Sequence, residues 1–390
     1  MAGVDTGGAD NACTTAVHNA DTATNPAAGA NPAPGAAEQA ALALVAAVSS
    51  PGPAALERAW ARLDSLTKPS RSLGRLEEIA ARIAAAQDTD RPSGTPSAIV
   101  LLAGDHGVVA EGVTPWPAEV TRQMMANFVA GGAAINQIAG HVGARLVLGD
   151  VGVAGDTSAL PGVVQLKVRP GTRNLAQGPA MTREEAAQAF LAGAGLAAGL
   201  VREGVRIVGT GEMGIGNTTP ASALTAAYAG ASPANVVGIG TGLDAAGVAR
   251  KVAVVERALL VNAPEPDDPF GTLAALGGLE IAGMAGVIVG AAAAGACAVS
   301  DGFISGAAAL AAVRICPACA GYLFPSHLSA EPGHRIVLGA LGLEPVLELD
   351  MRLGEGTGAA LAIGIMGAAC AMMSGMATFA EAGVSGRVDA

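Results

Sequence analysis

The sequence predicts an α/β protein whose mostly parallel, doubly wound sheet is covered by helices on both faces. Short continuous apolar runs alternate with Ala-rich stretches of helical character after residue 97. Such runs are typical of strands that are buried on both faces of a parallel sheet. The chain has 390 residues, of which 51% are hydrophobic, so it can form a large buried core. With 55 glycines and only 3% aromatic residues, the elements are expected to pack closely.

The first 37 residues are expected to form a disordered tail. They are mostly Ala, Asn, Thr, Gly and Pro, and no Lys or Arg appears before Arg58. This composition cannot bury a core. The apolar run 40–48 has no basic segment before it, so we interpret it as the first helix and not as the core of a signal peptide.

The next segment, 38–96, is predicted to be helical. Its leucines and isoleucines between residues 63 and 83 follow a helical spacing that is interrupted around Pro69, which predicts two helices and a turn. An α/β catalytic domain is expected over 97–358 and C-terminal helices over 359–390. The predicted strands are 97–103, 145–148, 205–208, 236–239, 287–289 and 346–349.

Two apolar stretches, 281–300 and 356–380, contain no charged residue. Each is rich in Ala and Gly and is bounded by acidic residues, which favours buried helices over membrane spans. The formal charge of −11 argues against a nucleic-acid partner, because neutralising phosphates requires a basic surface.

The five cysteines are unevenly spaced and do not form the pattern of a disulfide framework, which favours a cytoplasmic location. Cys316 and Cys319 form a C-x-x-C pair. No second pair completes a tetrahedral zinc site, so a structural role is expected for them.

The loop 209–220 follows a predicted strand, and Pro220 opens a helix. Backbone amides in this loop, around Gly214, Gly216 and Asn217, can cradle a phosphate. Its glycines also satisfy the G-x-G-x-x-G dinucleotide pattern, but the acidic residue expected about twenty residues later is missing. An NAD-linked oxidoreductase is therefore an alternative interpretation.

Two glutamates stand out in these loops. Glu355 lies between two glycines and next to apolar elements, so its backbone can approach a ligand and burial would raise its pKa toward that of a general base. The alternative is an acid that stabilises a helix N-terminus. Glu212 follows the phosphate loop's first glycines, where a carboxylate must face another part of the ligand. Its alternative is a solvated loop acid.

Further candidates for the same edge of the sheet lie in two loops and at Lys251. Asp105 and His106 follow a predicted strand and can line the site, although a structural hydrogen-bonding role is equally compatible with them. Hydroxyl groups in the loop 325–331 are suited to binding a phosphate, and Lys251 can supply a positive charge.

Taken together, five segments resemble the nicotinate-nucleotide:dimethylbenzimidazole phosphoribosyltransferase family, which makes the lower-ligand nucleotide of cobalamin. The resemblance covers about residues 55–380. The segments are LDSLTKPSRSLGRLE at 63–77, DHGV at 105–108, GEMGIGNTT at 211–219, SHLSAE at 326–331 and RLGEGTG at 352–358.

This resemblance implies roles for individual residues. Glu355 matches the catalytic base and Glu212 a second active-site carboxylate. The positions that match phosphate-binding residues are Gly214, Lys251 and Ser329. The positions that match the benzimidazole pocket are Leu353, Trp116 and Met124, the last two standing where some relatives carry a smaller polar residue and an amide.

The implied reaction moves the 5-phosphoribosyl group of nicotinate mononucleotide to 5,6-dimethylbenzimidazole. It releases nicotinate and gives α-ribazole 5′-phosphate with inversion at C1′. The resemblance implies no cofactor or metal, a homodimer, and a small helical subdomain built from the N- and C-terminal segments. A non-catalytic nucleotide-binding or membrane protein is the remaining alternative.

Overall fold

The computed structural model describes residues 34–385, so most of the predicted tail lies outside the described residues. The first helix, α1 (Ala36–Ala46), begins inside the segment that was expected to be a tail. Its Glu38 is buried and forms an ion pair with Arg183, which anchors the helix to the folded chain. The first helix therefore starts four residues before the predicted run at 40–48.

The core of the protein is a six-stranded sheet in the order β3-β2-β1-β4-β5-β6, in which every neighbouring pair is parallel. Its strands, in chain order, are β1 (Ser97–Gly104), β2 (Arg145–Gly152), β3 (Val163–Gln165), β4 (Ile207–Met213), β5 (Cys297–Ser300) and β6 (Leu323–Pro325). The chain winds outward from β1 to β3, and then returns to β4 on the other side of β1. This reversal between β1 and β4 confirms the doubly wound parallel sheet, and it is the position where such sheets bind ligands.

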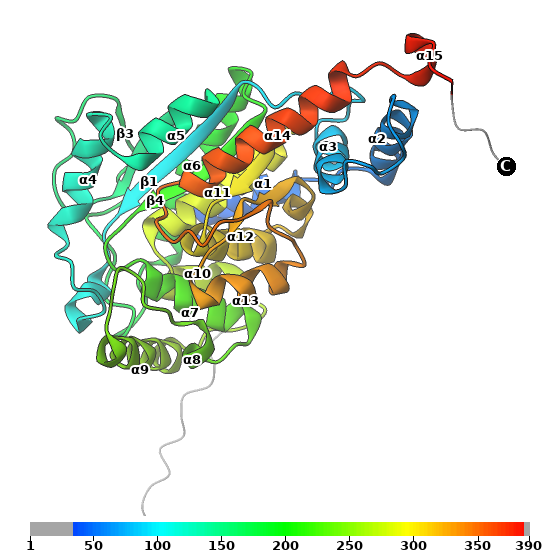
Figure 1. Cartoon of the computed structure of the whole chain (residues 1–390). Coiled ribbons are helices and arrows are strands. Elements are labelled where there is room, and N and C mark those ends of the chain that lie inside the picture. Colours follow the sequence, from blue (N-terminus) through cyan, green and yellow to red (C-terminus); the bar gives the residue numbers. More distant parts are fainter. Residues whose placement is uncertain (1–33, 386–390) are drawn as a thin grey trace, which may run out of the picture. The chain divides into compact units, whose positions relative to one another are not determined.

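Helices cover both faces of the sheet, as the buried strand pattern predicts. On one face lie α6 (Arg183–Arg202), α11 (Leu279–Ala293) and α12 (Phe303–Ile315). On the other lie α4 (Glu119–Val129), α5 (Ala134–Val142) and α14 (Thr357–Gly375). Figure 1 shows α14 running alongside β1, with its first turn close to the label of β4.

The remaining elements surround this core. Those that follow β4 are α7 (Thr218–Ala229), α8 (Pro233–Val236), α9 (Ala245–Asn262) and α10 (Pro269–Leu276). Those that precede α14 are α13 (Pro332–Leu341) and a second small sheet of β7 (His327–Leu328) and β8 (Leu347–Glu348). Two short 3-10 helices are η1 (Gly107–Glu111) and η2 (Pro317–Tyr322).

The N- and C-terminal segments join, as the family resemblance implied. The helices α2 (Pro53–Ser65) and α3 (Arg75–Ala86) correspond to the two predicted helices, and α3 packs on α14. Leu66 forms a β-bridge with Thr378, just before α15 (Phe379–Ala382), and Arg62 donates a 3.0 Å hydrogen bond to the carbonyl of Met376. The far end of α14 is thus tied to the first helices of the chain (Figure 1).

Three of the six predicted strands need correction. Residues 287–289 lie inside α11 and residues 236–239 form the end of α8 and a loop. A short apolar run does not reveal by itself whether it belongs to a strand or to a buried helix, and α11 is apolar on every side after Glu280 in its first turn. Residues 346–349 contain β8, which pairs with β7 outside the main sheet. The short strands β3, β5 and β6 were not predicted.

Both uncharged stretches contain helices that pack against the rest of the chain. All but one residue of α11 are buried. Within the described part of the chain, α14 is the one helix that is long and apolar enough to cross a membrane, by length and composition alone. Half of that helix is buried against protein, so this is a weak indication.

The helices α6 and α11 touch backbone to backbone. A Cβ atom on Gly193 of α6 would lie 1.9 Å from the carbonyl oxygen of Gly283 in α11, and one on Gly286 would lie 1.8 Å from the carbonyl oxygen of Phe190. Neither carbonyl can move away without breaking its own helix. Glycine is therefore required where these helices cross, and the high glycine content has a packing cause.

This contact predicts a contrast between two glycines of the same helix. We expect Gly193→Ala to lower the free energy of unfolding by about 1–3 kcal/mol, because the added methyl group overpacks the crossing. The matched control is Gly195→Ala, which places a methyl group in open space and should stabilise α6 by roughly 0.5–1 kcal/mol. Urea denaturation of both variants measures the difference, and equal stability would contradict the packing argument.

Candidate active site

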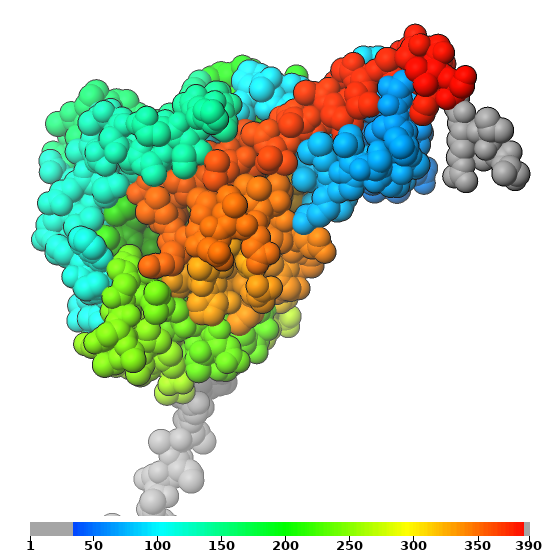
Figure 2. Space-filling view, viewed as in Figure 1, coloured from blue at the N-terminus to red at the C-terminus, as the bar shows by residue number. Residues whose placement is uncertain are grey.

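A cavity of about 430 Å³ opens beyond the carboxyl ends of β4, β5 and β6. Its wall comes from six regions: the start of α4 and the segment before it, the end of β4 with the loop after it, the loop before α9, the loop after β5, the segment after β6, and the residues that precede α14. In Figure 2 the surface is hollowed where the cyan, green and orange segments meet. The position agrees with the rule for open α/β sheets, which bind ligands at the point where the strand order reverses.

Glu212 reaches this cavity from β4 itself. The predicted strand was to end at residue 208, but β4 continues to Met213, so Gly209 and Gly211 lie within a strand and not in a loop. A Cβ on Gly209 would meet Ile99 and Ala359, and one on Gly211 would lie 2.7 Å from the carbonyl oxygen of Glu355. These two glycines serve strand packing. They do not form the phosphate turn that the NAD-linked alternative required.

Glu355 sits in an unusual turn. Gly354, Glu355 and Gly356 have φ angles of 86°, 63° and 86°, so three successive residues adopt left-handed backbone. This conformation costs a non-glycine residue about 1–3 kcal/mol and persists only where the surroundings impose it. Here the surroundings are the backbone of β4 and the start of α14. Oε2 of Glu355 is buried and has no hydrogen-bond partner within residues 34–385.

Burial raises the pKa of Glu355 above its usual value, and the nearby charge of Asp301 raises it further. Hydrogen bonding from the backbone of Ile135, at the start of α5, acts in the opposite direction. A carboxylate with a raised pKa and a free oxygen is suited to accepting a proton from a weakly acidic ligand group.

Asp301 holds the beginning of α14 in place. It follows β5, is 1% exposed, and accepts hydrogen bonds from the backbone amides of Gly356 at 3.3 Å and Ala359 at 2.9 Å. These amides lie at the start of α14, where backbone N–H groups have no hydrogen-bond acceptor within the helix. Burial raises the pKa of Asp301, whereas His327 and the amides oppose that change.

Glu212 is a lining carboxyl group with little support for a negative charge. It is buried, and its one hydrogen bond to a described side chain comes from the amide of Asn217. Burial, with the charges of Glu280, Asp301 and Glu355, raises the pKa of Glu212 to about 8, against the smaller effect of Asn217. At neutral pH this side chain is mostly a neutral acid.

A polar half of the cavity is formed by Ser329, Glu331, Thr218 and Gly240. Directly behind it, Lys251 is 1% exposed and its ammonium group donates a hydrogen bond to the hydroxyl of Thr218. Burial lowers the pKa of Lys251 to about 8, against the opposing attraction of Glu331. Glu331 accepts a hydrogen bond from the amide of Gly240 at 3.0 Å, which shapes the loop over the lysine.

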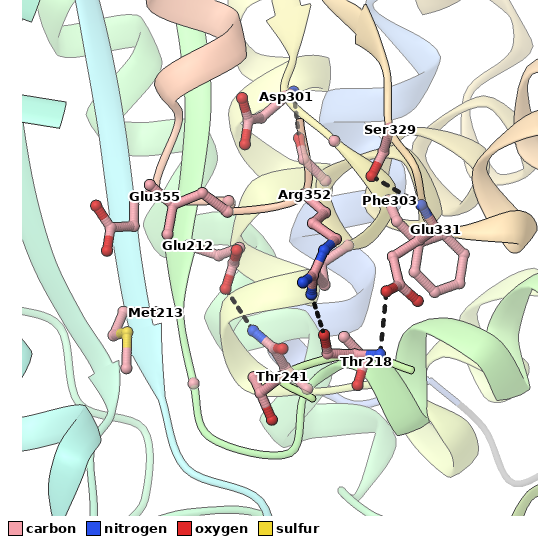
Figure 3. A pocket seen from close by; sticks show the side chains of 18 of the residues that line it. Glu212, Met213, Thr218, Thr241, Asp301, Phe303, Ser329, Glu331, Arg352 and Glu355 are labelled. Atoms are coloured by element: carbon pink, nitrogen blue, oxygen red, sulfur yellow. Dashed lines mark hydrogen bonds between the residues drawn. The ribbon is translucent and has the colours of Figure 1, made fainter. Parts of the chain in front are cut away.

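The other half of the cavity is apolar. Its side chains are Trp116, Val120, Met124, Met213 and Leu353. The indole N–H of Trp116 donates to the carbonyl of Thr241 at 3.3 Å, and this links two loops across the cavity. In Figure 3, Glu355 and Met213 lie at one end of the view, whereas Ser329 and Glu331 lie at the other.

Most residues predicted from sequence meet in this one cavity. Those that line it are Trp116, Met124, Glu212, Gly214, Asn217, Ser329, Leu353 and Glu355. Gly216 and Lys251 do not line it, but Gly216 adjoins the lining residue Asn217, and Lys251 of α9 donates a hydrogen bond to the lining residue Thr218. Asp105 and His106 were expected to line the site. They are instead buried one layer behind it, where His106 pairs with Glu280.

Several lining residues were not predicted. They include Thr218, Thr241, Asp301, Phe303, His327 and Arg352. Asp301 follows β5, and an identified strand at 297–300 would have pointed to it. Arg352, which donates to the carbonyl of Gly240 at 3.1 Å, stands in a motif already recognised and is the lining residue that carries a fixed positive charge. Among residues 34–385 no group of three or more His, Cys, Asp or Glu side chains is placed to hold a metal.

Comparison with known proteins supports the family resemblance found in the sequence. A family described as Phosphoribosyltransferase matches residues 48–384. The nicotinate-nucleotide–dimethylbenzimidazole phosphoribosyltransferase of Geobacter metallireducens is 53% identical over 329 residues, which are 84% of this chain and 93% of that protein. The enzyme of the same name from Solidesulfovibrio magneticus is 54% identical over 330 residues, with the same coverage.

Solved structures agree with the sequence relatives. The crystal structure of the nicotinate-nucleotide–dimethylbenzimidazole phosphoribosyltransferase from Thermus thermophilus superimposes with a TM-score of 0.81 at 49% identity. The match covers 86% of this chain and 99% of that one. With the fold, the cavity and the matched motifs all in agreement, the chain belongs to the nicotinate-nucleotide–dimethylbenzimidazole phosphoribosyltransferase family.

Proposed function

We propose that the protein transfers the 5-phosphoribosyl group of nicotinate mononucleotide to 5,6-dimethylbenzimidazole, releasing nicotinate and forming α-ribazole 5′-phosphate. One observation carries this assignment: a glutamate with a free, buried oxygen stands at the apolar end of a cavity whose other end is polar and backed by a lysine. A flat apolar acceptor with one acidic N–H fits the first end, and a phosphate fits the second.

The proposed reaction is a single displacement at C1′. The pyridine-type nitrogen of the benzimidazole attacks C1′ on the face opposite nicotinate, and Glu355 takes the proton from the other ring nitrogen. Nicotinate leaves with the electron pair of the broken C–N bond, so its ring loses its positive charge. Enclosing both reactants in one cavity supplies proximity, which is worth several kcal/mol of the barrier.

The phosphate of nicotinate mononucleotide is proposed to lie at the polar end. The loop from Gly214 to Asn217 leads into α7, where the helix dipole favours an anion. The amides of Ile215 and Asn217 already donate to Thr121 and Gly214, so we assign the phosphate to the start of the helix and not to those two amides. Ser329 offers a hydroxyl group, and Lys251 offers its charge through the layer formed by Thr218 and Gly240. Gly216 has a φ of 89°, which allows this loop to turn tightly.

We also propose a cytoplasmic homodimer. The four cysteines among the described residues are free and buried, in keeping with a reducing compartment. Large apolar side chains stay exposed beside the cavity and on α14, namely Trp116, Leu353 and Ile365, and a second copy of the chain would cover such surface. Sedimentation velocity tests the dimer, and a monomer at micromolar concentration would contradict it.

The direct test of the function is an assay with purified protein, nicotinate mononucleotide and 5,6-dimethylbenzimidazole. We expect nicotinate and α-ribazole 5′-phosphate to appear in equal amounts, in buffer without added metal. Omitting the benzimidazole is the control for simple hydrolysis. No turnover by a folded sample would refute the proposal, and NAD binding would favour the oxidoreductase alternative.

Replacing Glu355 tests the base. Glu355→Gln keeps the shape of the side chain but cannot accept a proton, so kcat should fall by at least roughly a hundredfold while nucleotide binding persists. Steady-state kinetics and a binding titration with nicotinate mononucleotide measure the two effects. Turnover near that of the unmodified protein would place the base elsewhere.

Replacing Lys251 tests the phosphate site. Lys251→Met fills the same buried space without charge, so KM for nicotinate mononucleotide should rise roughly 10- to 100-fold. In the unmodified protein the charge is present below the lowered pKa of about 8 and is lost above it, so KM should rise at alkaline pH. The variant should lack this dependence, and an unchanged KM at neutral pH would remove Lys251 from the site.

A further inference from the structure

His327 lines the cavity but has no part in the reaction described so far. It lies in β7, immediately after Ser326, and it is 2% exposed. An imidazole ring has two nitrogen atoms, and in the neutral ring one of them donates a hydrogen bond while the other accepts one. The neighbours of the two nitrogens therefore determine what His327 can offer to a ligand in the cavity.

The hydrogen bonds of Ser326 determine which nitrogen of His327 carries the proton. Ser326 is fully buried, and its hydroxyl group donates to the carbonyl of Asp301 at 2.8 Å, because a carbonyl oxygen can only accept. The one proton of the hydroxyl group is used in this bond. In the 3.1 Å contact between Ser326 Oγ and His327 Nδ1, the donor is therefore the N–H group of the ring. The neutral ring thus keeps its lone pair on Nε2.

The two nitrogens of His327 have different surroundings. Nδ1 is enclosed, because it contacts Ser326 and because a Cβ on Gly358, at the start of α14, would lie 2.0 Å from it. Nε2 lies near Gly302, a lining residue of the cavity, whose Cβ would lie 3.5 Å from this nitrogen. No hydrogen bond from residues 34–385 reaches Nε2. A ligand in the cavity can therefore supply the partner of this nitrogen.

The neighbours of His327 also indicate which part of the substrate it faces. On one side, a Cβ on Gly302 would lie 3.3 Å from Cε1 of His327 and 3.7 Å from Cβ of Ser329, so both side chains lie against this one glycine. On the other side, His327 packs against Gly358, which is three residues after Glu355. His327 thus lies between a residue of the proposed phosphate site and the turn that carries the proposed base.

In nicotinate mononucleotide, the ribose ring connects the phosphate to the reacting carbon C1′ and carries hydroxyl groups at C2′ and C3′. A hydroxyl group is a suitable donor for the lone pair of a neutral imidazole. We propose that Nε2 of His327 binds a ribose hydroxyl of the nucleotide, and that it makes the site specific for the ribonucleotide over a deoxy analogue. The inference rests on the proposed function. It assigns His327 to substrate recognition and leaves the proton transfer to Glu355.

The probes are nicotinate mononucleotide and its 2′-deoxy and 3′-deoxy analogues, and isothermal titration calorimetry measures the Kd of each. The unmodified protein should bind one deoxy analogue roughly 10- to 100-fold more weakly than the ribonucleotide, because Nε2 then has no hydrogen-bond donor. This measurement does not depend on the folding of any variant. Equal affinity for all three nucleotides would overturn the inference.

Two variants separate the roles of the ring nitrogens. His327→Asn can still donate to Ser326 from the position of Nδ1, but it has no atom at the position of Nε2. It should lose the discrimination against the deoxy analogue. His327→Gln places an amide oxygen near the position of Nε2, and should bind the ribonucleotide more tightly than His327→Asn does. Discrimination that persists in His327→Asn, or an equal loss of affinity for all three nucleotides, would refute the contact.

Inorganic phosphate distinguishes recognition of the ribose from recognition of the phosphate. As a competitor of nicotinate mononucleotide, it should bind more weakly to Lys251→Met and equally well to His327→Asn. Weaker phosphate binding by His327→Asn would place His327 at the phosphate and would refute the ribose contact. The matched control is His141→Asn, which replaces an exposed histidine at the end of α5 and should leave every affinity unchanged.

These titrations need no turnover, so they separate this inference from the proposed function. A protein that discriminates against a deoxy analogue but has no transferase activity would refute the proposed function alone. A protein that forms α-ribazole 5′-phosphate but binds all three nucleotides equally well would refute the role of His327 alone.

Discussion

The site depends on one contact, in which the backbone of β4 touches the backbone of the turn before α14. A Cβ on Gly211 would lie 2.7 Å from the carbonyl oxygen of Glu355, so strand and turn approach too closely for a side chain between them. The turn follows β4 only by adopting left-handed backbone at three successive residues. That geometry is imposed on Glu355, and its energetic cost is offset by the packing of α14 on the sheet.

The same contact determines how charge is distributed. Because the turn presses against β4, Glu355, Glu212 and the start of α14 share a small buried volume, and Asp301 enters it to satisfy the first amides of the helix. Such crowding would be unfavourable if every acid were ionised. Uptake of a proton by one of these carboxyl groups relieves that crowding.

The positions of three glycines explain why the dinucleotide-binding interpretation was wrong. Gly209, Gly211 and Gly214 match a dinucleotide pattern in spacing, yet the first two lie in a strand and pack on α14 or its preceding turn. The third fits over the pair of His106 and Glu280. In a chain this rich in glycine, a match to the G-x-G-x-x-G spacing indicates close packing as readily as it indicates a phosphate-binding turn.

The sequence by itself determined the α/β class, the longer strands β1, β2 and β4, the first helices and eight of the residues that line the cavity, because apolar runs and ordered motifs are local signals. It did not determine β3, β5 and β6, whose three or four residues carry too little pattern. It also did not distinguish α11 from a strand. Only the tertiary structure showed that Asp301 lines the cavity and that His106 does not. The ionisation of a buried carboxyl group likewise depends on neighbours that are distant in the chain, as Glu280 is from Glu212.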